Sequence, residues 1–213
     1  GEIAAAEPGS VYFARRVENA PKLDGVLAPA EGWRLDGQLA KPLVGEPDNR
    51  VRFDVLWDAS RLYVGVEVKD DALLTRDGWG VSHHKMDCVV FYFDGTNNRE
   101  ATYNFDDRRI ACGPTSRGQT DRSWNIGPRL ATSVRAQATP DGYVMECSFK
   151  LNAMGVPNQA PGKRYDAAGA VLGFDIVNRD LDRKDGEQTR IGWRGTSSNP
   201  EDPSQFGTLI LKP

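Results

Sequence analysis

Two consecutive runs of alternating apolar residues constrain the fold of this chain more than any other feature. Apolar side chains occupy every second position in residues 53–57 and again in residues 62–68. A period of two is typical of a β-strand with one face against a core. Asp and Ser in residues 58–60 favour a tight turn, so the sequence predicts a hairpin. A third apolar strand at 87–94 follows a loop, the kind of segment that carries function in β-proteins.

The rest of the chain predicts many short strands and no long helix. Brief helical turns are expected at 28–33 and 151–156. Further strands are expected at 11–17, 101–105, 109–112, 129–138, 143–150, 171–178, 189–194 and 206–211. We therefore expect an all-β fold: a single antiparallel β-sandwich of two sheets, jelly-roll-like or immunoglobulin-like, with short helical turns. Residues 1–21 would form the N-terminal segment and first strand, and 22–213 the sandwich, as one domain.

Composition narrows the classes of partner. The 213 residues suffice for one β domain with a sizeable core. A net charge of −3 argues against a nucleic-acid-binding protein, which would present a basic face. Apolar runs all fall short of the ~20 residues that span a bilayer, so membrane insertion is not expected. Three cysteines are too few for a disulfide scaffold. Cys88 and Cys147 are predicted to be core residues, and one disulfide among the three stays open.

Several short motifs recur in a characteristic order. They are Leu-Asp-Gly at 23–25, Trp33, Gly-Tyr-Val-Met-Glu at 142–146, Gly-Phe-Asp-Ile at 173–176, Trp193 and Phe-Gly-Thr-Leu at 206–209. Together with the strands above they resemble the family 9 carbohydrate-binding modules, within the DOMON-like sandwiches, from about Lys22 to Leu211. The resemblance implies a non-catalytic domain that binds a poly- or oligosaccharide end. It also implies an exported protein, secreted, periplasmic or at the cell surface, that works with a glycan-active catalytic domain.

Aromatic platforms and planar polar side chains are what a sugar site needs. Trp33, Trp57 and Trp193 occupy strand-like or motif positions and are predicted to be buried. Trp79 and Trp124 lie in polar loops and are candidate platforms. The predicted ligand-binding residues are Trp79, His84, Asn104, Trp124, Arg179 and Asp180.

The resemblance also shows a departure. Sugar-binding family members clamp a terminal sugar between two tryptophans. The first aligned position falls near His84, with Trp79 a few residues earlier, and the second falls near Pro200, where no aromatic residue stands. A glutamate of the third strand falls at Val90. The two-tryptophan clamp is therefore not preserved, and we expect either a ligand other than the end of a plant glucan or the loss of the site.

Structural calcium is a further implication of the resemblance. Calcium needs hard oxygen ligands, and residues 94–98 and 106–107 are rich in them, although neither segment matches the EF-hand pattern. Asp94 and Asp107 are the predicted metal ligands. Residues 180–186 also fit, but their mixed charge is typical of a solvated turn.

Two other functions stay open. Some DOMON-like domains bind b-type haem, and residues 83–86 place His, Lys and Met together, although neighbours on a strand face opposite ways. An enzyme is less expected, because the sequence has no Gly-x-Ser-x-Gly, P-loop or His-Glu-x-x-His motif. A glycosidase-type carboxylate pair cannot be selected by pattern from 30 acidic residues.

Overall fold

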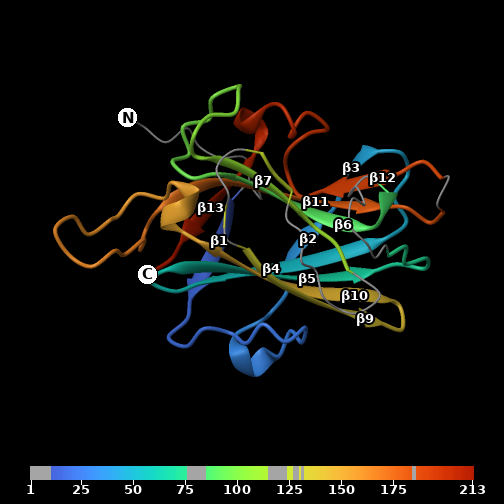
Figure 1. Cartoon of the computed structure of the whole chain (residues 1–213), viewed down its shortest axis with the longest axis horizontal. Helices are drawn as coiled ribbons and strands as arrows, with labels where there is room; N and C mark the ends of the chain where they lie inside the picture. Colours follow the sequence, from blue (N-terminus) through green and yellow to red (C-terminus); the bar gives the residue numbers. More distant parts are fainter. Residues whose placement is uncertain (1–10, 76–84, 115–123, 127–129, 131, 184–185) are drawn as a thin grey trace.

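The protein is a sandwich of two β-sheets (Figure 1). The computed structural model describes residues 11–75, 85–114, 130, 132–183 and 186–213, and the backbone of 124–126. Sheet A contains β3 (Lys41–Val44), β6 (Cys88–Asp94), β7 (Asp107–Cys112), β8 (Trp124–Ile126), β11 (Val171–Asp180), β12 (Thr189–Gly192) and β13 (Gly207–Leu211). Sheet B contains β2 (Gly37–Leu39), β4 (Arg50–Trp57), β5 (Arg61–Lys69), β9 (Thr132–Thr139) and β10 (Gly142–Lys150).

One strand joins the two sheets. The first part of β1 (Val11–Arg16) pairs with β13 in sheet A, and its last two residues pair with β4 in sheet B. Both pairings are parallel, whereas the other described pairings are antiparallel. Buried Asp54 holds the crossing, because it accepts hydrogen bonds from the Tyr12 hydroxyl (2.9 Å) and the Arg15 guanidinium (2.6 Å). The predicted sandwich is confirmed, with β1 as its parallel element.

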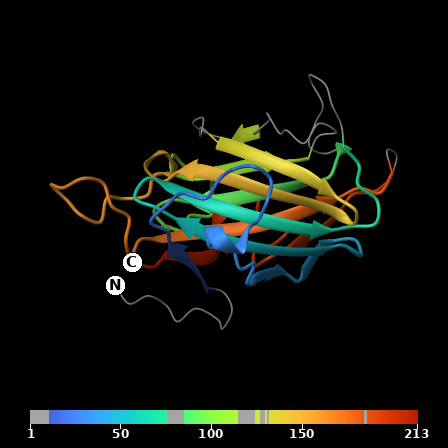
Figure 2. The same cartoon turned by 90° about the horizontal axis from the view of Figure 1, so that it is seen from below.

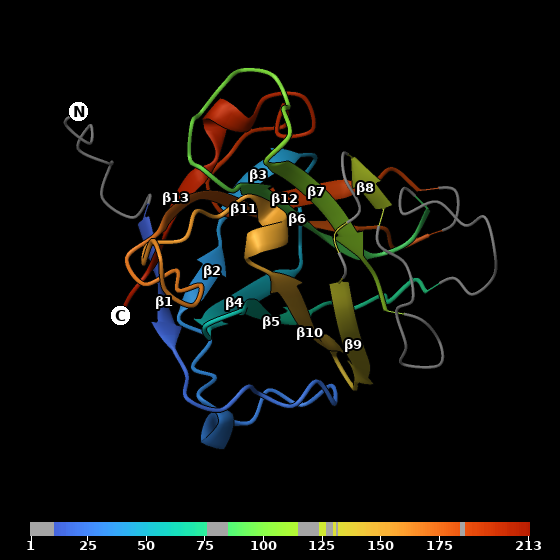
Figure 3. The same cartoon turned by 60° about the vertical axis from the view of Figure 1, so that its left-hand side comes forward.

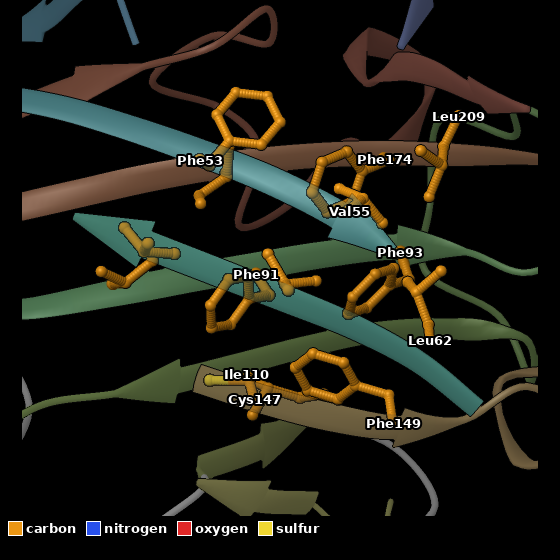
Figure 4. Close-up of a cluster of buried hydrophobic side chains, with 14 of the residues drawn as sticks. Phe53, Val55, Leu62, Phe91, Phe93, Ile110, Cys147, Phe149, Phe174 and Leu209 are labelled. Atoms are coloured by element: carbon orange, nitrogen blue, oxygen red, sulfur yellow. The ribbon is translucent and has the colours of Figure 1, made fainter. Parts of the chain in front are cut away.

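The core lies between the sheets and confirms the alternation in the sequence. The alternating residues of 53–57 and 62–68 all belong to one buried cluster. Aromatic rings bridge the layers (Figure 4): Phe149 of sheet B lies 5.4 Å from Phe91 and 5.0 Å from Phe93 of sheet A, between ring centroids. Each such side chain contributes roughly 1.5–3 kcal/mol by leaving water. The predicted turn is also present, since Asp58 Oδ1 accepts from the amides of Ser60 and Arg61.

The outer face of sheet B is covered by the chain itself. The segment that contains η1 (Pro29–Glu31) lies across β4 and β5 (Figure 2). There Trp33 packs on Leu56 and Tyr63, as the prediction of a buried tryptophan requires. Buried Glu146 fixes the segment by accepting from the amides of residues 24 and 25. This face is therefore closed by protein.

The connection between β6 and β7 differs from its prediction. Residues 101–105, predicted as a strand, form an irregular loop. The reason is that aspartate side chains bond the backbone amides between β6 and β7, which removes them from a ladder. The predicted helical turns are present as η1 and η3 (Asn152–Met154), and a further one, η4 (Pro203–Gln205), lies before β13. All three cysteines are buried free thiols, so no disulfide joins them.

Candidate functional site

The predicted sugar-binding residues do not all meet in one place. Asn104 lies in the loop beyond the Asp94 end of β6, where it bonds Glu100 and Asp106. Arg179 lies beside Cys88, at the opposite end of β6. Trp79 and His84 lie outside the described residues. For Trp124 only the backbone is described, and it pairs with Ala111 of β7.

The outer face of sheet A gathers three arginines and a tyrosine from four neighbouring strands, β7, β6, β11 and β12. Cross-strand pairing places Arg109 of β7 opposite Tyr92 of β6, and Arg179 of β11 opposite Arg190 of β12. On β11 the even positions 172, 174 and 176 point into the core, so the odd positions point outward. We call Tyr92, Arg109, Arg179 and Arg190 the arginine face.

An apolar floor lies among these polar groups. A second buried cluster, separate from the main core, forms on this side of sheet A from Cys88, Val90, Tyr92, Ala111, Val177 and Phe206. Val90 stands where the resemblance expects a glutamate, so the middle of the face is apolar. All six side chains are at most 3% exposed, so this cluster supports the arginines from beneath and is not itself an open surface.

The arginines influence one another electrostatically. Burial, and then the neighbouring charge of Arg179, lower the pKa of Arg190. Burial raises the pKa of Tyr92, while Arg109 and Arg179 oppose that rise, and Arg179 donates a hydrogen bond to the Tyr92 hydroxyl. The buried Nε of Arg190 has no hydrogen-bond partner among the described residues. A group that brings acceptor oxygens or negative charge to this face would therefore be stabilised.

Asp175, which also points to the outer face of sheet A from β11, already has hydrogen-bond partners. Asp175 accepts hydrogen bonds from the amides of Arg194 (2.9 Å) and Gly195 (2.7 Å) and from the Asn199 side chain. The Tyr103 hydroxyl donates to the Asn199 carbonyl (2.6 Å), which joins two loops that lie side by side (Figure 3). Asp175 thus holds a loop in place.

Asp180 faces away from Arg179, its neighbour in sequence. Its Oδ2 accepts from the Thr189 hydroxyl at 3.1 Å, and the side chain is buried. It gathers with other carboxylates from neighbouring strand ends, so the structure separates it from the arginine face.

The loop of the predicted metal ligands is organised by hydrogen bonds. Asp94 accepts from the amides of Asn98 (3.2 Å) and Arg99 (2.9 Å), and Asp107 Oδ2 accepts from the Asn104 amide (2.7 Å). The other oxygen of Asp107, Oδ1, is buried without a hydrogen-bond partner among the described residues. The pair therefore fits a hydrogen-bonded turn with one spare oxygen, and calcium there stays a prediction.

A pocket of about 660 Å³ lies elsewhere, beside the β4–β5 turn. Its lining includes Asp58, which is committed to the turn through bonds to Ser60, Arg61 and the Tyr63 hydroxyl. This pocket brings no comparable group of polar side chains to an apolar floor. We therefore place the candidate site on the arginine face.

Sequence reasoning found Arg179 but missed Tyr92, Arg109 and Arg190. All three lie in predicted strands, and the alternation of side chains along a strand would have assigned each to one face of its strand. Which strands are neighbours depends on the order β7-β6-β11-β12, which no local pattern contains. Among the described part of the chain, no helix is long and apolar enough to span a membrane.

Known structures resemble this fold closely. A family 9 carbohydrate-binding module from Caldicellulosiruptor kristjanssonii in complex with cellotriose has a TM-score of 0.77 and 19% identity, over 95% of this chain and 93% of the other. A structure of such a module from the same organism in complex with glucose gives a TM-score of 0.73 and 21% identity, over 95% of each chain. At these identities the likeness concerns the fold.

Curated relatives are much longer proteins. Endo-1,4-beta-xylanase C of Paenibacillus barcinonensis is 25% identical over 172 residues, which cover 79% of this chain and 14% of the xylanase. Endo-1,4-beta-xylanase A of Thermoanaerobacterium saccharolyticum is 24% identical over 205 residues, or 92% of this chain and 15% of the xylanase. A profile described as carbohydrate family 9 binding domain-like matches residues 23–213. The chain therefore belongs to this family and is a non-catalytic carbohydrate-binding module.

Proposed function

We propose that this module binds the end of a glycan chain on the arginine face. The observation that carries the proposal is the pair of partly exposed arginines, Arg109 and Arg190, beside buried Arg179 and above the buried apolar cluster. Binding would combine stacking and hydrogen bonding and would break no bond. The solved relatives in complex with cellotriose and glucose support a glucan-like ligand, because they share the fold.

The charge of the face favours a glycan that carries a carboxylate, such as one ending in a uronic acid. Guanidinium groups bind carboxylates through two parallel hydrogen bonds, which a neutral sugar cannot match. Val90 replaces the glutamate expected from the resemblance, and Asp175 is engaged by backbone amides. An acidic sugar would also relieve the mutual repulsion of Arg179 and Arg190.

Trp79 and Trp124 remain the proposed platforms. β8, which begins at Trp124, pairs with β7 beside Ala111 of the floor. Removing a platform tryptophan should cost about 1–3 kcal/mol of binding free energy, the scale of burying a large aromatic side chain. The xylanase relatives support the further proposal that the module acts in an exported protein beside a catalytic domain.

Calorimetry with short oligosaccharides tests the site. We expect Arg109→Gln and Arg190→Gln each to weaken binding at least tenfold, about 1.4 kcal/mol. Arg164→Gln is the control, because this arginine is exposed and lies in the pocket beside the β4–β5 turn. If both test variants bind as tightly as the wild type, the site is elsewhere.

A comparison of two ligands tests the preference for an acidic sugar separately from the location of the site. A cello-oligosaccharide and its analogue with a terminal glucuronic acid differ mainly in charge. Tighter binding of the acidic sugar, lost in Arg190→Gln and weakened by salt, supports the charge preference. Equal or tighter binding of the neutral sugar rejects that preference and leaves the location to be judged by the arginine variants.

A further inference from the structure

Two of the three cysteines meet in the core between the layers. Cys112 is the last residue of β7 in sheet A, and Cys147 lies within β10 of sheet B. Both belong to the main buried cluster, as do their strand partners Val89 and Val64. Their side chains therefore point inward from opposite sheets, and Figure 4 shows Cys147 among the core side chains. A hydrogen bond joins the two thiols.

The third cysteine lies on the other face of sheet A. Cys88 of β6 belongs to the separate outer cluster with Val90, whereas the residue between them, Val89, belongs to the main core. Successive side chains of a strand point to opposite faces, so Cys88 points away from sheet B. Of the three possible pairs of cysteines, the structure brings together in the core the pair from β7 and β10.

A covalent bond between the two layers is compatible with a sandwich. Sheets stack about 10 Å apart, whereas a disulfide joins Cα atoms about 4.4–6.8 Å apart, so the layers must approach each other locally. Immunoglobulin domains show that two facing sheets can do this. Here the thiols are already in contact, and Cys112 ends its strand. Closing the bond therefore displaces the end of a strand and leaves its middle in place.

The folded core shields both thiols from reagents in solution. Cys112 and Cys147 are each 0% exposed, and burial raises the pKa of Cys147 well above its usual range. The thiolate is the form that attacks a disulfide, so the folded reduced protein reacts slowly with an oxidant. We therefore expect the bond to form while the chain folds, before the two sheets close. Once formed, the bond is shielded from reductants by the same burial.

We propose that Cys112 and Cys147 are a modification site and form a disulfide between the sheets when the chain folds with a disulfide oxidant present. One cysteine thiolate attacks the S–S bond of the oxidant, for example oxidised glutathione, and releases one thiolate. The other cysteine thiolate attacks the protein sulfur of this mixed disulfide and releases the second thiolate. The two cysteines lose two protons and two electrons in total, and the oxidant becomes two thiols. Export, which belongs to the proposed function, supplies such oxidants, while the pairing of the thiols is independent of glycan binding.

The bond holds the edge of sheet A against sheet B. β7 pairs with β6 on one side and with the short strand β8 on the other, and it carries Arg109 of the arginine face. A disulfide here closes the loop 112–147, which restricts the unfolded chain and stabilises the folded one. The oxidised protein is therefore expected to melt at a higher temperature than the reduced protein.

Refolding of the wild type under two redox conditions tests the proposal without any sugar. The chain is unfolded and reduced, then refolded either with reduced glutathione alone or with a mixture of reduced and oxidised glutathione. Free thiols are alkylated in denaturant and counted by mass. We expect three alkylated cysteines after reducing refolding and one, Cys88, after oxidising refolding, with the peptides of Cys112 and Cys147 linked. The melting temperature of the oxidised protein should be higher by about 5–10 °C.

Two alanine variants identify the partners. Cys88→Ala is the matched control and should form the same bond with the same rise in melting temperature, whereas Cys112→Ala should show no difference between the two refolding conditions. If Cys112→Ala does not fold, the peptide map of the wild type decides. The proposal is overturned if three thiols remain after oxidising refolding, if the bond includes Cys88, or if the oxidised protein melts no higher than the reduced one.

Discussion

Two groups of buried or half-buried aspartates lie at opposite ends of β6, and they differ in what satisfies their oxygens. At one end, Asp94 accepts from two backbone amides, and Asp106 accepts from the amide and hydroxyl of Thr96. At the other end, Asp70 and Asp180 each keep a buried oxygen that accepts no hydrogen bond from the described residues. Burial of an acidic residue is common to both ends, so burial alone does not indicate a metal site.

The two ends also differ in charge balance. Arg108 lies among the Asp94 group, where it offsets the charges of Asp106 and Asp107 and bonds the carbonyls of Phe105 and Ala153. The resolved electrostatic neighbours of Asp180 include aspartates but no basic residue. Among the described residues, a guanidinium is thus inserted into the Asp94 group, whereas at the other end Arg183 acts on Asp182 at the margin of the group. The difference teaches that amides and a guanidinium satisfy most of the Asp94 loop, where Oδ1 of Asp107 stays without a partner, while the Asp180 cluster keeps two such oxygens among the described residues.

The largest expected effect on stability comes from removing the Asp94 carboxylate, which accepts backbone hydrogen bonds at its end of β6. Asp94→Ala leaves two partly buried amides without acceptors, each worth about 1–3 kcal/mol when unsatisfied. We expect the free energy of unfolding to fall by about 2–4 kcal/mol, equally with and without calcium, as measured by urea denaturation. Asp141→Ala is the control, because that carboxylate is exposed and forms a surface ion pair with Lys69 of small value. A loss that calcium restores would show that the Asp94 loop is itself a metal site.

The fold could be predicted from the sequence more readily than the difference between the two ends of β6. The hairpin could be predicted because its alternating residues and its turn lie within one short stretch, 53–68. The crossing of β1 could not, since it depends on contacts of Tyr12 and Arg15 with Asp54 far along the chain. Local patterns report a period and a turn, and they contain no information on which distant strands become neighbours.

The same limit applies to the acidic residues. Asp94 and Asp107 were selected because oxygen-rich residues stand together in sequence, and in such turns the side chains usually bond local amides. Asp70, Asp87 and Asp180 come from three separate parts of the chain beside predicted strands, although Asp70 is followed by Asp71 and Asp180 opens the run 180–186. They meet only because β5 and β11 end, and β6 begins, on the same side of the sandwich. The sequence did contain a signal, because each of the three strands has an aspartate at one end. The signal could be recognised only with knowledge of which strands are neighbours.

A smaller stability effect is expected from mutual repulsion between the carboxylates of Asp70 and Asp180. In metal-free buffer, Asp70→Asn and Asp180→Asn should each stabilise the protein by about 1 kcal/mol, because each removes part of the same repulsion. The double variant should gain less than the sum, with a coupling of about 0.5–1 kcal/mol in a double-mutant cycle by urea denaturation. Additive effects would mean that the two carboxylates do not interact.

The smallest effect on stability is expected at Asp107, whose Oδ1 lacks a hydrogen-bond partner among the described residues. Asp107→Asn keeps an acceptor for the Asn104 amide, and Arg108 keeps its bonds to backbone carbonyls. The free energy of unfolding should therefore change by about 1 kcal/mol or less. Any rise in melting temperature that calcium gives the wild type should be kept in this variant, because Asp107 is already engaged by the Asn104 amide. If instead Asp107→Asn removes the calcium effect while Asp180→Asn retains it, the hydrogen-bonded turn would be the metal site, and the unpartnered oxygens of Asp70 and Asp180 would be protonated acids.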